Sequence, residues 1–500
     1  MGCVVLALWL FSLLTSTACY RLMQNQFTEQ SNPPIIMSHH SLRRLVYAAA
    51  LLAPALALHA ATHYVTLGES IQIKVDAATA GDTIIIFGGS YHENVTIGKQ
   101  LTLQRVAGES VFITGNLTYQ NITAAAATPL IISNLKIGGG LALNSCTNVT
   151  LENLDLSSGF NLNNTSNVVV ETTAIGHFSG DYNARIWAGN STAVSTYFNR
   201  TELTLSRVKV TGTFYMNNNF GGFTSRALNL LQCTLTNGNT VEVSGGKIRL
   251  LYSKLSRVQI STASSDAVIL GNTFKYGGRH PGGAIVVREG KAVIRNNEIT
   301  IPGGGGNGDD GSGIEGNAWN NGILVAACDA LIANNYMHDF GIFAYNERDE
   351  DRNGVFVVNV SITKPVRIHG NILGTGLRRP VYAPFGVTYT YNNEVTGGHA
   401  GGVISENNIG GSPLFVNSAT GDYRLGVGSP CINAGSPFAW LNDRDGTRND
   451  IGLYGGAAYD PEGTTTSKPI TFLLQGTPLT VIKGAHPTLN ISGGGIVVGR

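Results

Sequence analysis

A short frame recurs along the middle of the chain and limits the folds that the chain can adopt. The frame is an apolar residue, two variable residues, often an asparagine, one variable residue and a second apolar residue. It appears as ISNLKI at 132–137, LENLDL at 151–156, IRNNEI at 294–299 and IANNYM at 332–337. Many successive frames lie about 20 residues apart, and apolar residues alternate inside each frame. This pattern indicates short strands that turn at regular intervals.

Two repeat architectures have a period near 20 residues. Leucine-rich repeats have it, but this chain lacks their dense leucine and asparagine consensus with helical segments. Glycine, asparagine and threonine between the frames favour a β-solenoid, in which each coil buries its inward side chains on its neighbours. Asparagine accepts the left-handed backbone of a tight corner, and stacked asparagines hydrogen-bond from coil to coil.

Two motifs flank the repeats: SIQIKVDAATAGDTIIIFGGSYHENVTI at 70–97, and SPLFVNSATGDYRLGVGSPCINAGSP at 412–437 followed by DRDGTRNDIGLYGG at 443–456. Together with the frames, they resemble exported bacterial members of the pectin-lyase-like superfamily of right-handed parallel β-helix proteins, over roughly 62–456. The resemblance implies an all-β fold, a single-stranded right-handed parallel β-helix of about twelve coils. It also implies an N-terminal helical cap from Ile71 to Ala78. It names no single activity, because this fold carries lyases, hydrolases, epimerases and adhesins.

The N-terminal residues predict export. We expect a leader over 1–61, with translation starting at Met37 and a signal peptide over 37–61; the alternative is one long leader. The domains expected after it are the β-helix with its cap at 62–411, a closing segment at 412–460, and a β appendage or sorting tail at 461–500. The expected location is the medium or the cell surface, with no integral membrane segment in the mature chain.

The net charge limits which classes of partner the protein is expected to bind, and the cysteine content indicates whether disulfides stabilise it. The net charge of +1 gives no reason to expect nucleic acid as a partner. The cysteines beyond the leader, Cys146, Cys233, Cys328 and Cys431, are too few and too far apart for a disulfide framework, and we expect buried single thiols. We expect a monomer.

Some gaps between frames are longer than 20 residues. The extra residues fall at one corner of neighbouring coils, after the NNxI strand and before a GIxV-type strand. The first such insertion is expected at 176–190. Equivalent corners stack about 4.8 Å apart, so the loops are expected to lie side by side along one face and to line a cleft for an extended polysaccharide. The candidate catalytic residues are Asp309, Asp310, His338 and Asp339. The candidate substrate-binding residues are Arg279, His280, Trp319, Tyr345, Arg348, Arg378 and Arg379.

An unbroken run of six charged residues at 347–352 interrupts a chain in which only 13% of residues are charged. Asp349, Asp351 and Asn353 stand at alternate positions before Gly354, as at the start of a calcium-binding loop. The closing glutamate is missing, because Val360 holds the twelfth position, and a solvated loop tip is the alternative. Calcium is the one cofactor that the sequence suggests. The carboxylates of DRDGTRND at 443–450 are interpreted as structural.

The sequence predicts polysaccharide binding and leaves catalysis open. A glycoside hydrolase needs paired carboxylates, whereas a polysaccharide lyase needs a cation or arginine beside the sugar carboxylate and a base. The loops contain residues for either reaction but no diagnostic spacing. The alternative is a non-enzymatic cell-surface adhesin or structural protein.

Overall fold

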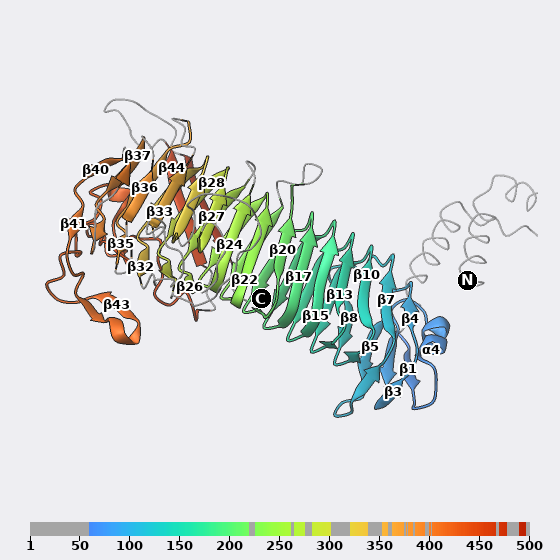
Figure 1. Ribbon diagram of the computed structural model, residues 1–500. Coiled ribbons are helices and arrows are strands. Elements are labelled where there is room, and N and C mark those ends of the chain that lie inside the picture. Colours follow the sequence, from blue (N-terminus) through green and yellow to red (C-terminus); the bar gives the residue numbers. More distant parts are fainter. Residues whose placement is uncertain are drawn as a thin grey trace, which may run out of the picture. The chain divides into compact units, whose positions relative to one another are not determined.

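The structure of the protein is a computed structural model (Figure 1). The chain divides into two compact units, Met1–His59 and Ala60–Arg500, and the first unit, with most of the expected leader, lies outside the described residues. In the described part of the chain, no helix is both long and apolar enough to cross a bilayer. The described residues are 60–219, 226–261, 265–275, 283–301, 321–338, 353–358, 363–374, 377, 379–383, 386–395, 400–401, 403–466, 470–477 and 490–496.

Three ladders of parallel strands form the solenoid, and each complete coil visits them in the same order. Figure 1 shows the strands of successive coils stacked side by side. The first ladder has 16 strands, each paired in parallel with the strand of the next coil. They are β1 (Thr62–Val65), β2 (Thr83–Ile86), β5 (Thr102–Arg105), β8 (Leu130–Ser133), β11 (Thr147–Glu152), β14 (Ser166–Glu171), β16 (Ala184–Gly189), β18 (Leu203–Ser206), β21 (Ala227–Leu231), β23 (Lys247–Leu251), β25 (Asp266–Leu270), β28 (Lys291–Arg295), β31 (Asp329–Ala333), β34 (Val366–His369), β37 (Val387–Thr390) and β40 (Ile404–Glu406).

The second and third ladders share four long strands, which run through both without a break. The second ladder comprises β3 (Gly89–Tyr91), β6 (Val111–Ile113), β9 (Lys136–Ile137), β12 (Asp155–Leu156), β15 (Ala174–Asp181), β17 (Thr192–Asn199), β19 (Lys209–Val210), β22 (Thr234–Ser244), β24 (Lys254–Ser261), β26 (Thr273–Lys275), β29 (Glu298–Thr300), β32 (Tyr336–His338), β35 (Ile372–Leu373), β38 (Asn393–Glu394) and β41 (Ile409–Gly410). The third comprises β4 (Val95–Ile97), β7 (Asn116–Gln120), β10 (Gly140–Asn144), β13 (Phe160–Asn163), β15, β17, β20 (Phe214–Asn217), β22, β24, β27 (Ile285–Arg288), β30 (Ile323–Ala326), β33 (Asn353–Val358), β36 (Arg379–Ala383) and β39 (Ala400–Gly401).

The chain is therefore a parallel β-helix, and the fold class predicted from the sequence is confirmed. The 16 strands of the first ladder exceed the number of coils expected. One additional coil lies between Ile175 and Val210, because Ala193 takes the inward position there and pairs with Val210. The loop insertion expected at 176–190 is wrong, since these residues form most of β15 and all of β16.

Inward side chains stack in rows that run through the solenoid. Alternation within each strand points every second residue inward, and the parallel register aligns the inward residues of successive coils. One row of the first ladder is fully or almost fully buried along its length: Ile84, Leu103, Ile132, Leu151, Val170, Ala188, Leu205, Leu230, Leu250, Ile269, Ile294, Ile332, Ile368 and Tyr389.

A left-handed corner joins each first-ladder strand from β8 onward to the next strand of the second ladder. One residue per coil holds this corner, with φ between 47° and 69°. Asparagine is common there because it tolerates the left-handed region better than most residues. The corner residues are Asn134, Asn153, Thr172, Asn190, Arg207, Gln232, Tyr252, Gly271, Asn296, Asn334, Gly370, Tyr391 and Asn407.

The residue after the corner builds an asparagine ladder in the last coils. Its members are Asn272, Asn297, Asn335, Asn371, Asn392 and Asn408. Each backbone N–H donates to the side-chain oxygen of the next member at 2.8–3.0 Å, and each side-chain amide donates to the same oxygen at 2.9–3.0 Å. The first five are buried. The ladder satisfies buried polar groups that the turns would otherwise leave unpaired.

The first flanking motif has a structural explanation. Helix α4 (Ile71–Ala77) begins after Ser70 and packs Ile71 and Val75 on the first strands. Glu93, from the YHE part of the motif, accepts from Ile71 N at 2.7 Å and from Ser70 Oγ at 2.8 Å. A carboxylate at a helix N-terminus pairs otherwise unsatisfied N–H groups. Asp82, from the GDT part, accepts from the backbone N–H groups of Ala61 and Thr79, both at 2.8 Å.

The closing segment expected at 412–460, together with the residues that follow it to 466, runs back along the left-handed corner. It contains β42 (Phe415–Asn417), η2 (Ser418–Thr420), β43 (Asp422–Leu425) and η3 (Ala439–Leu441). Its later residues meet earlier coils: Gly452 N donates to Gly370 O, Asn334 Nδ2 to Asp450 O, Asn296 Nδ2 to Leu453 O, Asp460 N to Tyr252 Oη, and Gln232 Nε2 to Thr466 O, all at 2.7–2.8 Å. The segment therefore ties together coils that lie far apart along the stack.

Apolar residues replace charged ones where this segment covers the second ladder. Residues that pair from coil to coil form rows along the second ladder. In one outward row, Lys136 and Asp155 stand in early coils, and Tyr336 and Ile372 stand in late coils. The late residues pack against the side chains of Tyr423, Cys431, Ile451 and Leu453. After the closing segment, β44 (Ile470–Thr477) and β45 (Asn490–Ile496) form an antiparallel pair.

The four cysteines of the described chain are free and buried, as predicted. Burial raises the pKa of Cys233 to about 12 and of Cys431 to about 11. These thiols are packing residues and remain protonated at neutral pH.

Replacing Asn335 with alanine tests the asparagine ladder. The change removes the acceptor of Asn297 N and the donor to Ile294 O, both buried. We expect a loss of about 2–5 kcal/mol in the free energy of unfolding, measured with urea. Asn163→Ala is the matched control, since Asn163 is exposed, and is expected to change stability by about 0.5 kcal/mol or less. Equal losses in the two variants would contradict the role of the ladder.

Candidate functional site

The predicted loop-bearing corner lies between the second and third ladders. In consecutive coils the chain passes from β26 to β27, from β29 to β30, from β32 to β33, from β35 to β36 and from β38 to β39. The strands before these connections pair in order, and so do the strands after them. All five connections therefore start and end at equivalent places in neighbouring coils.

Most of the predicted site residues lie outside the described residues. Those described are His338 at the end of β32, Arg379 at the start of β36, and the backbone of Asn353 at the start of β33. The remaining predictions for this corner are not tested by the structure; they concern Asp309, Asp310, Asp339, Arg279, His280, Trp319, Tyr345, Arg348, Arg378, Asp349 and Asp351.

His338 is enclosed by aromatic rings. Its side chain is 5% exposed. Its ring stacks on Tyr336 with centroids 4.3 Å apart, and the ring of Tyr423, from the closing segment, has its centroid 5.0 Å away. Its Nε2 lies 3.4 Å from Glu298 Oε1. The closing segment therefore helps to hold this histidine beside a carboxylate, next to the loop-bearing corner.

Arg379 and Asn353 are neighbours in the third ladder, where their Cα atoms are paired. The Arg379 guanidinium lies 5.5 Å from the ring centre of Tyr382, a residue of the same strand. Tyr382 is 40% exposed. A predicted substrate-binding arginine and a predicted calcium ligand thus come from adjacent coils.

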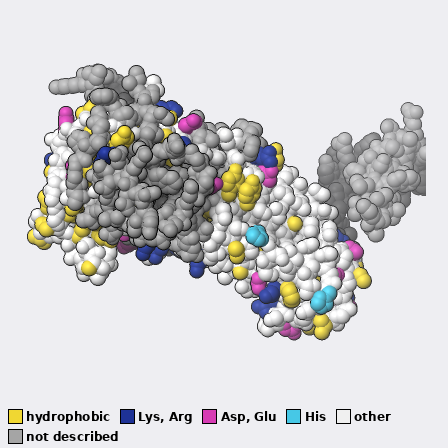
Figure 2. All heavy atoms as spheres, in the orientation of Figure 1, with side chains coloured by type: hydrophobic (Ala, Val, Ile, Leu, Met, Phe, Trp, Pro, Cys, Tyr) yellow, Lys and Arg dark blue, Asp and Glu magenta, His cyan; other side chains and the backbone are white. Residues whose placement is uncertain are grey.

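A second group of surface residues lies on the third ladder in the middle coils. We call Asp181, Tyr182, Tyr197, Arg200 and Tyr215 the tyrosine surface. Tyr197 and Tyr215 are register partners in β17 and β20, and their rings stack with centroids 4.8 Å apart and planes inclined by 15°. Tyr182 is 47% exposed and Tyr197 52%. Figure 2 shows hydrophobic side chains gathered over this part of the molecule, with charged side chains beside them.

Polar groups border the two stacked rings. Arg200 Nε donates to Asp181 Oδ1 at 2.7 Å, and its guanidinium lies 3.7 Å from the ring centre of Tyr182. The hydrogen bond to Asp181 raises the pKa of Arg200, so the guanidinium stays charged. Asn217 Nδ2 donates to Tyr215 Oη at 3.2 Å. Aromatic rings beside hydrogen-bonding groups are a common arrangement in ligand sites.

The register row that contains Tyr197 and Tyr215 continues along the third ladder. Glu242 and Gln259 follow in the next two coils, and then Val286 and Leu324, which are buried. The row thus leads from the tyrosine surface to the coils that carry the long connections.

Part of this surface is detectable in the sequence. Aligning STYFN at 195–199 with TFYMN at 213–217 places a tyrosine at the same outward position of two coils. The recurring frame does not reveal it, because the coil of Ala193 lacks a recognisable frame. The pairing of Arg200 with Asp181 across coils has no sequence signal of its own.

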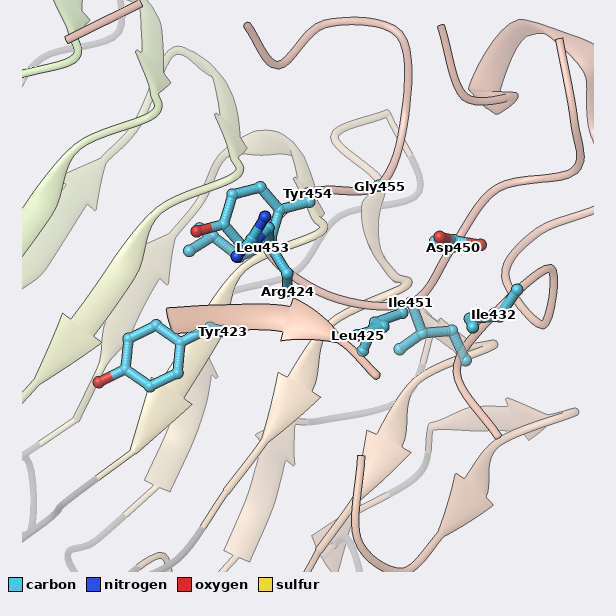
Figure 3. Close-up of a pocket in the computed structure, with 9 residues that line it drawn as sticks. All are labelled: Tyr423, Arg424, Leu425, Ile432, Asp450, Ile451, Leu453, Tyr454 and Gly455. Atoms are coloured by element: carbon cyan, nitrogen blue, oxygen red, sulfur yellow. The ribbon is translucent and has the colours of Figure 1, made fainter. Parts of the chain in front are cut away.

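A pocket of about 260 Å³ lies within the closing segment (Figure 3). Arg424 and Tyr454 line one side, and Asp450 and Ile432 line the other. Its charges already have partners, since Arg424 pairs with Asp422 at 2.6 Å and Asp450 Oδ1 accepts from Asn433 N at 2.6 Å. We interpret this pocket as a gap in the packing of the segment.

The carboxylates at 443–450 close turns. Asp443 Oδ2 accepts from Asp450 N at 3.0 Å, and Asp445 Oδ1 accepts from Thr447 N at 2.9 Å. Burial raises the pKa of Asp443 to about 6. Among the described residues, no three His, Cys, Asp or Glu side chains are grouped to hold a metal ion. These contacts agree with the structural interpretation of the motif.

Comparisons with known proteins return structures alone; no family model and no curated protein matches the chain. A pectate lyase matches with 11% identity, covering 79% of this chain and 96% of its own, at a TM-score of 0.24. The A-module of a mannuronan C-5 epimerase from Azotobacter vinelandii matches with 14% identity. The match covers 68% of this chain and 89% of the epimerase module, at a TM-score of 0.26. An alginate lyase from a Paenibacillus strain matches with 10% identity. The match covers 70% of this chain and 98% of the lyase, at a TM-score of 0.16. The fold assignment rests on the strand pairing above.

The titration of Asp443 predicts a pH dependence of stability. The folded chain holds this proton up to about pH 6, whereas the carboxyl of the unfolded chain loses it near the ordinary aspartate pKa of 3.8. Raising the pH through this window therefore favours the unfolded chain, and stability falls. We expect the thermal midpoint to decrease from pH 4 to pH 6 more steeply in the wild type than in Asp443→Asn. Parallel profiles for the two proteins would show that Asp443 does not titrate in this way.

Proposed function

We propose that this is an exported protein that binds an extended polysaccharide along the outer face of the third ladder. The chain of sugars lies between the tyrosine surface and the loop-bearing corner. The observation that carries the proposal is the stacked pair of Tyr197 and Tyr215 on adjacent coils, with Tyr197 half exposed. The apolar face of a sugar ring packs against an aromatic side chain, and nearby polar groups bind its hydroxyls.

The geometry of the row supports an extended ligand. Successive coils repeat about every 4.8 Å, so equivalent outward residues form a straight line along the solenoid. Tyr197, Tyr215, Glu242 and Gln259 follow one another on that line. A linear polymer that lies parallel to the axis meets each of them in turn, whereas a small compact ligand meets one or two.

The proposal also includes catalysis on the bound polymer, a calcium site and a location outside the cell. The loops predicted to line the cleft carry carboxylates, arginines and a partial calcium motif, and His338 lies beside Glu298 at that corner. These groups support a lyase or a glycoside hydrolase that acts on the bound polymer, with calcium at Asp349, Asp351 and Asn353. The leader supports a secreted or surface-bound location.

Removing the stacked pair tests the proposal. Mature wild-type protein and the double variant Tyr197→Ala, Tyr215→Ala are run through native gels that contain pectate, alginate or a neutral glucan. We expect at least one polymer to retard the wild type, and the double variant to bind it about tenfold more weakly. Tyr64→Ala is the matched control, because Tyr64 is 53% exposed on β1, the first strand of the first ladder, away from the tyrosine surface. Equal retardation of all three proteins would contradict the proposal.

The same polymers are then incubated with the wild type, with and without calcium, and unsaturated products and reducing ends are measured. Unsaturated products identify a lyase, and reducing ends without unsaturation identify a hydrolase. Retention of the polymer without turnover supports the non-enzymatic adhesin instead.

A further inference from the structure

A second exposed aromatic pair lies in the closing segment. Phe438 and Trp440 flank Ala439 at the start of η3 and are 55% and 52% exposed. Their ring centroids are 6.3 Å apart, and their planes are inclined by only 17°. Two large, half-exposed rings with nearly parallel planes therefore present apolar surface to the solvent. We call this pair the platform.

The platform is held rigidly. Leu441, the next residue, is buried, and its N–H donates to Phe438 O at 2.8 Å. Asn449 Nδ2 donates to Leu441 O at 2.8 Å from within the buried part of the segment. Ser436, just before the platform, is also fully buried. Buried residues on both sides therefore fix the backbone that carries the two exposed rings, which lowers the conformational entropy lost when a ligand packs on them.

The stretch of chain that carries the platform is itself uncharged, although Arg448 Nε donates to Gly435 O at 2.8 Å and Asp443 follows Asn442 directly. No Asp, Glu, Lys or Arg occurs from Cys431 to Asn442. This contrasts with the tyrosine surface, which carries the Asp181–Arg200 pair. Exposed aromatic rings in an uncharged stretch suit a ligand with an apolar face and neutral polar edges. Pyranose rings with equatorial hydroxyl groups have this chemistry, because their axial C–H bonds form the apolar face.

We propose that Phe438 and Trp440 form a separate binding site for a neutral β-linked polysaccharide. The site is distinct from the tyrosine surface, because its residues belong to the closing segment, whereas those of the tyrosine surface belong to the third ladder and the turns beside it. It attaches the protein to a neutral glycan while the outer face of the third ladder engages its own polymer.

Titration with cellohexaose tests this site by two readouts, calorimetry and tryptophan fluorescence. We expect Trp440→Ala to weaken binding about tenfold. Trp440→Phe keeps an aromatic ring, so it should retain most of the affinity. It should lose the fluorescence change, because the platform then contains no tryptophan. This pair of results places the sugar on Trp440.

The control separates this site from the proposed function. The double variant Tyr197→Ala, Tyr215→Ala is expected to keep both the affinity for cellohexaose and the fluorescence change. No binding of cellohexaose by the wild type, or undiminished binding by Trp440→Ala, would overturn the proposal. A doubling of the mass in solution that Trp440→Ala abolishes would also overturn it, because the platform would then bind a second copy of the chain.

Discussion

The hydrogen bond between asparagines of successive coils is the interaction on which the later half of the structure depends. Each member of the ladder gives its backbone N–H and its side-chain amide to the next member, inside the solenoid. An unpaired amide at that depth is costly, so a shift of one coil against its neighbour by a residue is strongly disfavoured. The register of these later coils is thereby fixed, and with it the position of their outward side chains.

Because the register is fixed, the outward side chains of successive coils line up and form continuous surfaces. One outward row changes from Lys136 and Asp155 to Tyr336 and Ile372 where the closing segment covers it. Another row brings Tyr197 onto Tyr215. The corner residues in turn hold the closing segment, which crosses several coils and encloses His338 with Tyr423. Fold, closure and candidate site are consequences of the same alignment of coils.

The fold is predictable from the sequence because its signal is periodic. The alternation of apolar residues repeats many times, and asparagines recur at the corners or directly after them, so the strands and the ladder can be predicted. The coil of Ala193 escapes this pattern, because alanines, Ala188 and Ala193, hold the two apolar positions of its frame. The path of the closing segment is not predictable, since it depends on contacts such as Asn296 with Leu453, which are far apart in sequence. The tyrosine surface depends on pairing between coils, and its members are separated by a whole turn.

The central claim is that a polysaccharide lies along the third ladder, parallel to the axis of the solenoid. A crystal structure of the mature protein with a bound oligosaccharide of the polymer that it retains tests this most directly. The account predicts consecutive sugar rings over Tyr197 and Tyr215, with the chain pointing toward the coils of Glu242 and Gln259. Sugar bound across a single coil, or only at a face that lacks these residues, would contradict it.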